Sequence, residues 1–167
     1  MIQPLPKNRL KKFYQSLPTK RIAAGALFFN HKNEVLVIKP SYKNHWSIPG
    51  GVVEREESPR QACQRECREE IGLKPTKLTL LCIDYKNSSN PKPESIQMVY
   101  YAGRLSQNTI SKIKIDNHEI IAHRFINLKN VIKALGGKNS PLAKRVKYCL
   151  SAIKNHRAYY LENGKIK

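Results

Sequence analysis

Acidic residues are scarce in this sequence. Its 167 residues include 12 Asp and Glu against 31 Lys and Arg, which gives a net charge of +19. No acidic residue precedes Glu34. Such an excess favours polyanionic partners, either nucleic acid or phosphorylated small molecules, because the positive field attracts both. The alternative is that the charge serves solubility alone.

Long apolar runs are also missing. No stretch approaches the roughly 18 consecutive apolar residues that suggest a membrane-spanning helix, and the basic N-terminal segment lacks the apolar core of a signal peptide. We therefore expect neither feature. The four cysteines form no C-x-x-C pair, so reduced thiols in a cytoplasmic protein are the simplest expectation; they are Cys63, Cys67, Cys82 and Cys149.

The few carboxylates are concentrated in one segment. Six of the 12 acidic residues lie between positions 54 and 70. Crowded carboxylates repel one another, which raises their pKa values unless a cation joins them, and hard cations such as Mg²⁺ take oxygen ligands. The segment therefore suggests a metal site, although most Glu-rich helices are simply solvated faces. The six are Glu54, Glu56, Glu57, Glu66, Glu69 and Glu70.

Local signals place most of this segment on a helix. Ser58 is a good N-cap, Pro59 suits the first helical position, and Gln61 completes a capping box. Gly72 suits the end of the helix. Three carboxylates then share one face at i, i+3 and i+4 spacing, beside an apolar stripe that can dock on a sheet. The carboxylates are Glu66, Glu69 and Glu70, and the stripe is Ala62, Cys63 and Cys67.

The spacing of the fixed residues resembles the Nudix box. Gly51 is followed by five residues, Glu57, seven residues and then the run from Arg65 to Leu73, RECREEIGL. Every fixed position of the family pattern matches. Cys67 stands where an aliphatic residue is usual, and buried cysteine behaves as a small hydrophobe. The preceding segment 46–51, WSIPGG, also resembles the strand and turn before the box in this family.

The order of elements predicts an α/β protein, and the resemblance implies a Nudix-type α/β/α sandwich with a mixed curved sheet. Expected strands are 22–29, 34–38, 46–48, 77–85, 95–105 and 119–126, and expected C-terminal helices are 127–135 and 140–157. We expect a basic helical extension at 1–20, a Nudix domain at 21–158 with the box at 51–73, and a basic tail at 159–167. The extension spaces Leu10, Phe13, Tyr14 and Leu17 along one helical face, so we expect it to pack as a lid.

The resemblance also implies a chemistry. Nudix relatives hydrolyse a nucleoside diphosphate linked to another moiety, with Mg²⁺, or Mn²⁺ as a substitute, between carboxylates and the substrate pyrophosphate. Arg65 would orient a glutamate, and the general base would be Glu66 or, outside the box, Glu119, with Asp116 as a weaker choice. The implied metal ligands are the Gly50 carbonyl, Glu57, Glu66, Glu69 and Glu70, and the expected substrate-binding residues are Trp46, Gly51 and Lys39.

The substrate stays open between nucleoside triphosphates, nucleoside diphosphate derivatives and capped RNA. An RNA 5′-pyrophosphohydrolase would suit the charge of +19. A non-catalytic nucleotide- or RNA-binding module is a further alternative, but such proteins usually lose box glutamates and here all are present. The sequence does not choose between a monomer and a homodimer.

Overall fold

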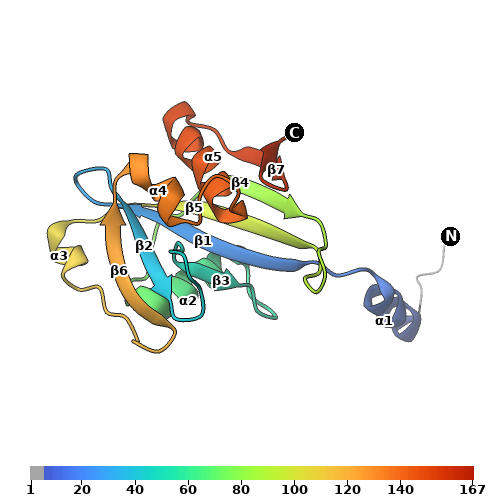
Figure 1. The fold of residues 1–167 in the computed structure, drawn as a ribbon. Helices are drawn as coiled ribbons and strands as arrows, with labels where there is room; N and C mark the ends of the chain where they lie inside the picture. The colour runs from blue at the N-terminus through green and yellow to red at the C-terminus, as the bar shows by residue number, and fades with distance from the viewer. Residues whose placement is uncertain (1–5) are drawn as a thin grey trace.

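The computed structural model describes residues 6–167 and arranges them around one eight-stranded mixed sheet (Figure 1). The strand order is β6-β2-β1-β5-β4-β7-β8, and β3 pairs separately with β1. The β1–β5 and β4–β7 pairs are parallel and the others are antiparallel. The strands are β1 (Arg21–Phe29), β2 (Val35–Pro40), β3 (Gly50–Val52), β4 (Thr79–Lys86), β5 (Ser95–Arg104), β6 (Ile120–Ile126), β7 (Tyr159–Glu162) and β8 (Lys165–Ile166).

Helices cover both faces of this sheet. The box helix α2 (Pro59–Ile71) lies on one face, and α4 (Leu128–Ala134) and α5 (Pro141–Asn155) lie on the other (Figure 1). Strand β1 serves both sides, because its side chains alternate: Ala26 and Phe28 join the core beneath α2, while Leu27 joins the core beneath α4 and α5. The α/β/α sandwich expected from the resemblance is therefore confirmed.

The predicted ends of α2 are confirmed. Ser58 Oγ accepts a hydrogen bond from the Gln61 amide at 3.3 Å, and Gln61 Oε1 accepts one from the Ser58 amide at 2.9 Å. Gly72 ends the helix in the left-handed conformation, at φ 72°. Capping and the buried stripe, which includes Cys63 and Cys67, therefore fix both the length of the helix and the face that it turns to the sheet.

The expected basic tail at 159–167 is wrong. Strand β7 pairs in parallel with β4, and β8 folds back on β7 as a hairpin. Leu161 is completely buried in the core beneath α5. The turn contains Asn163 and Gly164, both at positive φ, and Asn-Gly is the strongest short hairpin signal. The C-terminal segment is therefore part of the sheet rather than an appendage.

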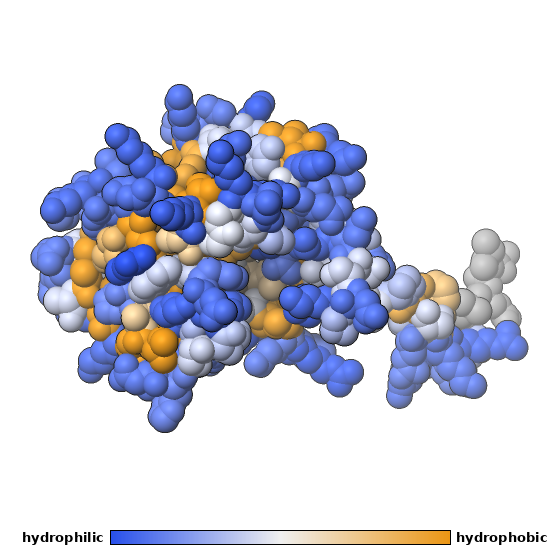
Figure 2. Space-filling view, viewed as in Figure 1, coloured by the Kyte–Doolittle hydropathy of each residue, from blue (hydrophilic) through white to orange (hydrophobic). Residues whose placement is uncertain are grey.

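The expected lid is also wrong. Helix α1 (Lys7–Ser16) forms, but none of its residues is buried, and it stands away from the sheet (Figure 1). Its side chains are part of a separate lobe in Figure 2. Tyr14 is 63% exposed, although Phe13 stacks on its edge. Residues 1–5 of the predicted extension lie outside the described residues.

Two smaller differences affect segments near the site. The expected strand at 46–48 is reduced to a single bridge between Ile38 and Ser47, and the strand begins instead at Gly50. A short helix, α3 (Gln107–Ile110), follows β5 where no helix was predicted. Within residues 6–167, no helix has both the length and the apolar character needed to cross a bilayer.

We expect Leu161→Ala to lower the free energy of unfolding by about 2–5 kcal/mol, because it leaves a cavity in the core. Ile166→Ala in β8 is the matched control, since Ile166 is 48% exposed. Urea unfolding of both variants measures the difference. Equal, small losses in the two variants would show that the C-terminal hairpin contributes little to the core.

Candidate active site

The candidate site lies where α2 meets β3, and a buried carboxylate is at its centre. Glu70 is 7% exposed, and its Oε2 accepts a hydrogen bond from the Gly50 amide at 2.7 Å. Burial raises the pKa of Glu70 to about 8, and the charges of Glu66 and Glu119 act in the same direction. The Gly50 hydrogen bond and Lys43 partly oppose this shift. The site therefore holds a carboxyl group whose ionisation an added cation would favour.

The glycine pair of β3 permits this close approach. A Cβ on Gly51 would lie 2.3 Å from Glu66 Oε1, and a Cβ on Gly50 would lie 2.3 Å from the Ala24 carbonyl oxygen. Gly50 also adopts φ 137°, which side chains rarely allow. The carboxylates of Glu66 and Glu70 can therefore lie directly against the β3 backbone. Larger residues at positions 50 and 51 would keep α2 farther from β3.

Arg65 binds three carboxylates of the box. Its Nε donates to Glu57 Oε1 at 3.0 Å and its Nη2 to Glu57 Oε2 at 3.1 Å, which makes a bidentate ion pair. Its Nη1 donates to Glu66 Oε1 at 2.9 Å and Glu69 Oε2 at 3.0 Å. Arg65 Nη2 also donates to the Val52 carbonyl oxygen at 3.0 Å, so one guanidinium joins α2, the preceding loop and β3.

Crowding acts on these carboxylates unequally. Arg65 lowers the pKa of Glu57, as expected where a cation joins crowded carboxylates. Burial raises the pKa of Glu66, although Arg65 opposes the shift. Glu54 lies at the margin, with its Oε1 3.9 Å from Arg65 Nη2, and Glu56 is exposed. The six predicted carboxylates therefore do not form one cluster.

Glu119 reaches the same site from the start of β6. Tyr42 Oη lies 3.5 Å from Glu119 Oε1, and the charge of Glu119 contributes to the raised pKa values of Glu66 and Glu70. Asp116 instead accepts hydrogen bonds from three backbone amides, including that of Ile120 at 2.9 Å, which lower its pKa. Asp116 therefore shapes the turn that carries Glu119 and is the poorer proton acceptor.

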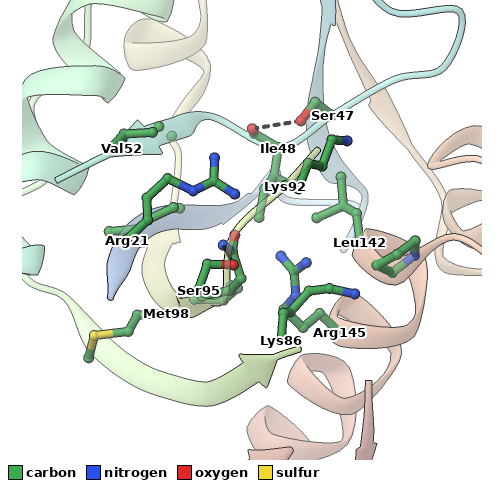
Figure 3. A pocket seen from close by; sticks show the side chains of 18 of the residues that line it. Arg21, Ser47, Ile48, Val52, Lys86, Lys92, Ser95, Met98, Leu142 and Arg145 are labelled. Atoms are coloured by element: carbon green, nitrogen blue, oxygen red, sulfur yellow. Dashed lines mark hydrogen bonds between the residues drawn. The ribbon is translucent and has the colours of Figure 1, made fainter. Parts of the chain in front are cut away.

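A cavity of about 510 Å³ opens beside the carboxylates. Its lining includes Gly50 and Gly51 at one end and crosses β1, β5 and β4 to the tips of the sheet; Figure 3 shows this hollow with Arg21, Lys86, Lys92 and Arg145 around it. No Asp or Glu of residues 6–167 contributes to the lining. The box carboxylates therefore lie just outside one end of the cavity, while the charged residues that line it are all cations.

Two of the three expected substrate-binding residues lie outside the cavity lining. Gly51 lines it, but Trp46 and Lys39 do not. Trp46 packs against the core, with the Arg124 guanidinium 4.1 Å from its ring centroid. Lys39 Nζ donates to the Lys43 carbonyl oxygen at 2.6 Å and so supports the loop. Lys43, from that same loop, does line the cavity.

The donor atoms suit a hard divalent cation. Glu66, Glu70 and Glu119 supply carboxylate oxygens within mutual electrostatic reach. Burial, and to a smaller extent the repulsion among these groups, raises the pKa values of Glu66 and Glu70. In residues 6–167, however, no three His, Cys, Asp or Glu side chains already converge as a metal site would require. Arg65 occupies oxygens of Glu57, Glu66 and Glu69 instead.

The pKa of Glu70 predicts how the stability of the metal-free protein depends on pH. The folded state keeps this proton up to about pH 8, whereas a glutamate in the unfolded chain loses it near its ordinary value of 4.5. The folded state thus binds more protons between these values, so stability falls as pH rises through that window, by up to about 1.4 kcal/mol per unit.

We expect Glu70→Gln to remove most of this fall, because glutamine carries no titrating proton. The part that remains belongs to Glu66, whose pKa is also raised. Glu56→Gln is the matched control, since Glu56 is exposed. Urea midpoints in EDTA at pH 5 to 8.5 make the comparison. A wild-type protein whose stability is flat or rises across this window would contradict the buried, protonated state of Glu70.

Comparison with known proteins gives a family match. A family model described as NUDIX domain matches residues 19–147. The 8-oxo-dGTP diphosphatase of Proteus vulgaris is 44% identical over 64 residues, which cover 36% of this chain and 56% of that protein. An RNA pyrophosphohydrolase of Haemophilus influenzae (strain PittEE) is 39% identical over 59 residues, which cover 35% of this chain and 30% of that protein. The matches therefore span little more than half of the first relative and under a third of the second.

A solved structure matches over a longer range. The crystal structure of a MutT protein from Methanosarcina mazei Go1 has a TM-score of 0.60 to this structure at 24% sequence identity. The similarity covers 84% of this chain and 99% of that one. At this identity, the likeness shows a common fold.

Proposed function

The chain belongs to the NUDIX family, and from that premise we propose that it hydrolyses a pyrophosphate bond in a nucleoside di- or triphosphate derivative with a divalent cation, Mg²⁺ or Mn²⁺. The observation that carries the proposal is the pairing of buried Glu70 with the Gly50 amide at the mouth of a cationic cavity. The names of the relatives, a diphosphatase and a pyrophosphohydrolase, support the same reaction class.

The charged side chains at the site have separate proposed roles. Glu57, Glu66, Glu69, Glu70 and the Gly50 carbonyl would hold the cation, which when bound neutralises phosphate charge and lowers the pKa of a water. Arg65 would position the carboxylates rather than contact the substrate. It donates hydrogen bonds to both carboxylate oxygens of Glu57 and to one oxygen each of Glu66 and Glu69. Lys43 interacts electrostatically with Glu70 and Glu119 and lines the cavity. It would bind the substrate phosphates at the cavity mouth.

Two carboxylates are candidates for the proton acceptor. Glu66 lies against Gly51 with its pKa raised by burial, which suits a group that takes a proton from the attacking water. Glu119 reaches the same region from β6, and Tyr42 holds its Oε1 in place. Either would transfer the water proton away as the oxygen attacks phosphorus and the bond to the leaving phosphate oxygen breaks.

We expect Glu70→Gln to fold normally and to lower kcat/KM by about 10²- to 10⁴-fold, because the substitution removes a charge from the cation site. Phosphate release from a nucleotide panel measures the effect, with Glu56→Gln as the control that retains activity. Excess EDTA should abolish turnover in the wild type. Undiminished hydrolysis in EDTA, or a third of wild-type turnover in Glu70→Gln, would refute the assigned role.

An RNA 5′-pyrophosphohydrolase is the second candidate, favoured by the net charge of +19 and by one relative's name. Helix α1 adds exposed cations such as Arg9 and Lys12 without any carboxylate. A non-catalytic module is disfavoured, because every box glutamate is present.

Salt dependence separates the small-nucleotide and RNA alternatives. We expect kcat/KM for a nucleoside triphosphate to fall only shallowly with salt, because a small ligand contacts few cations and the Debye length is about 8 Å at physiological ionic strength. RNA would contact many phosphate-binding cations and show a steep log–log slope. Submicromolar affinity for a 20-mer RNA at physiological salt, lost on removing α1, would favour the RNA candidate instead.

A further inference from the structure

Strand register gathers three polar side chains at the end of the cavity remote from the box. Arg21 of β1 pairs with Ser95 of β5, and Ser95 pairs with Lys86 of β4. Residues paired directly across a sheet point to the same face, so these side chains form one row with Ser95 in the middle. All three line the cavity, as does Lys92 from the β4–β5 connection (Figure 3).

The cations of this row have no counter-ion among residues 6–167. The ion pairs within residues 6–167 use Lys20, Arg65, Arg145 and Lys167, and none involves Arg21, Lys86 or Lys92. The nearby carboxylates are already committed elsewhere. Lys20 and Tyr85 both bind Glu94. Asp84 receives Arg145 Nε at 2.9 Å and the Gly164 amide at 2.9 Å. The row therefore presents uncompensated positive charge to the cavity.

The middle residue adds a directional donor. Ser95 is only 3% exposed, and its Oγ accepts a hydrogen bond from Gln97 Nε2 at 3.0 Å. Among residues 6–167, the Ser95 hydroxyl donates no hydrogen bond. That proton can therefore point into the cavity, between the two flanking cations, whose Cα atoms lie about 10 Å apart across two strand spacings.

The row lies at a defined distance from the box. Gly50 pairs with Gly25, and Arg21 precedes Gly25 by four residues on the same strand, which corresponds to about 13 Å along β1. Between these positions the cavity floor is formed by uncharged residues, among them Ala23 and Gln97. A ligand can therefore lie along the cavity with one anionic group at the box and another at the row.

We propose that Arg21, Ser95 and Lys86, together with Lys92 from the β4–β5 connection, form a second anion site. This site binds a phosphate group that is remote from the pyrophosphate bond that is cleaved. The proposal rests on the proposed function only for the orientation of the substrate. The preferred substrates would then be nucleotides that carry a further phosphate on the side of the sugar away from the pyrophosphate. That phosphate could be a terminal monophosphate or the first phosphodiester of a short oligonucleotide.

Binding measurements test the site without catalysis. Calorimetry compares AMP with adenosine 3′,5′-bisphosphate and with the 5′-phosphorylated dinucleotide pApA. We expect at least a fivefold lower Kd for one or both ligands that carry the added phosphate. Preference for the bisphosphate would identify a terminal monophosphate as the source, and preference for pApA would identify a phosphodiester. Equal Kd values for all three ligands would overturn the proposal.

Matched variants assign the gain to the row. Arg21→Gln combined with Lys86→Gln should abolish the added affinity, whereas Arg21→Lys combined with Lys86→Arg should retain it. Lys74→Gln combined with Lys77→Gln controls for the loss of two charges, because both lysines are exposed and neither lines the cavity. Within residues 6–167 neither Arg21 nor Lys86 makes a side-chain hydrogen bond or ion pair, so we expect unchanged melting temperatures. A gain that survives the double glutamine variant would overturn the assignment.

Hydrolysis of ATP and of ATP bearing a 3′-phosphate separates this proposal from the proposed function. A lower Kd for the bisphosphate or pApA without hydrolysis of any nucleotide would support the anion site and contradict the function. Hydrolysis of both triphosphates with equal KM, together with equal Kd values for the three ligands, would support the function and contradict the anion site.

Discussion

The arrangement of the candidate site depends on one buried contact, the hydrogen bond from the Gly50 amide to the Glu70 carboxyl group. A carboxyl group at this depth loses most of its hydration, which is why its pKa rises to about 8. One amide only partly compensates for that loss. A hard cation would compensate for it far better, so burial of Glu70 creates the demand for a metal that the proposed reaction uses.

The surrounding structure maintains that contact. Capping by Ser58 and Gly72 fixes where α2 begins and ends, and therefore which turn faces β3. The absence of side chains on Gly50 and Gly51 allows the strand backbone to approach α2. Arg65 then joins the loop, the strand and the helix through charge-assisted hydrogen bonds. The fold thus positions the carboxylates, while the sheet on the other side of β1 supplies a cavity for the rest of a ligand.

Sequence patterns predicted the local features well and the long-range ones poorly. The helix from Pro59 to Ile71 follows from capping residues and apolar spacing, both of which act over a few positions. Whether Leu161 packs inside, or whether the α1 face is covered, depends on partners far along the chain. The Asn163–Gly164 turn did carry a local hairpin signal, but the short, polar strands around it concealed the pairing with β4.

The same limit applied to the site. The box carboxylates could be identified from their spacing, whereas Lys39 and Trp46 were expected to bind substrate and instead support the loop and the core. No local signal marks Arg21, Ser95 and Lys86 as neighbours, because 74 positions separate Arg21 from Ser95 in the sequence and only strand register joins them. Pairing across a sheet has to be known before such a row can be recognised.

We expect a divalent cation to replace the proton of buried Glu70 when it binds. Calorimetric titration of Mg²⁺ at pH 7 in two buffers with different ionisation enthalpies counts the protons released on binding. We expect release of nearly one proton in the wild type, because the pKa of Glu70 is about 8 without metal, and a much smaller release in Glu70→Gln. Binding of Mg²⁺ without proton release, or with the same release in both proteins, would contradict it.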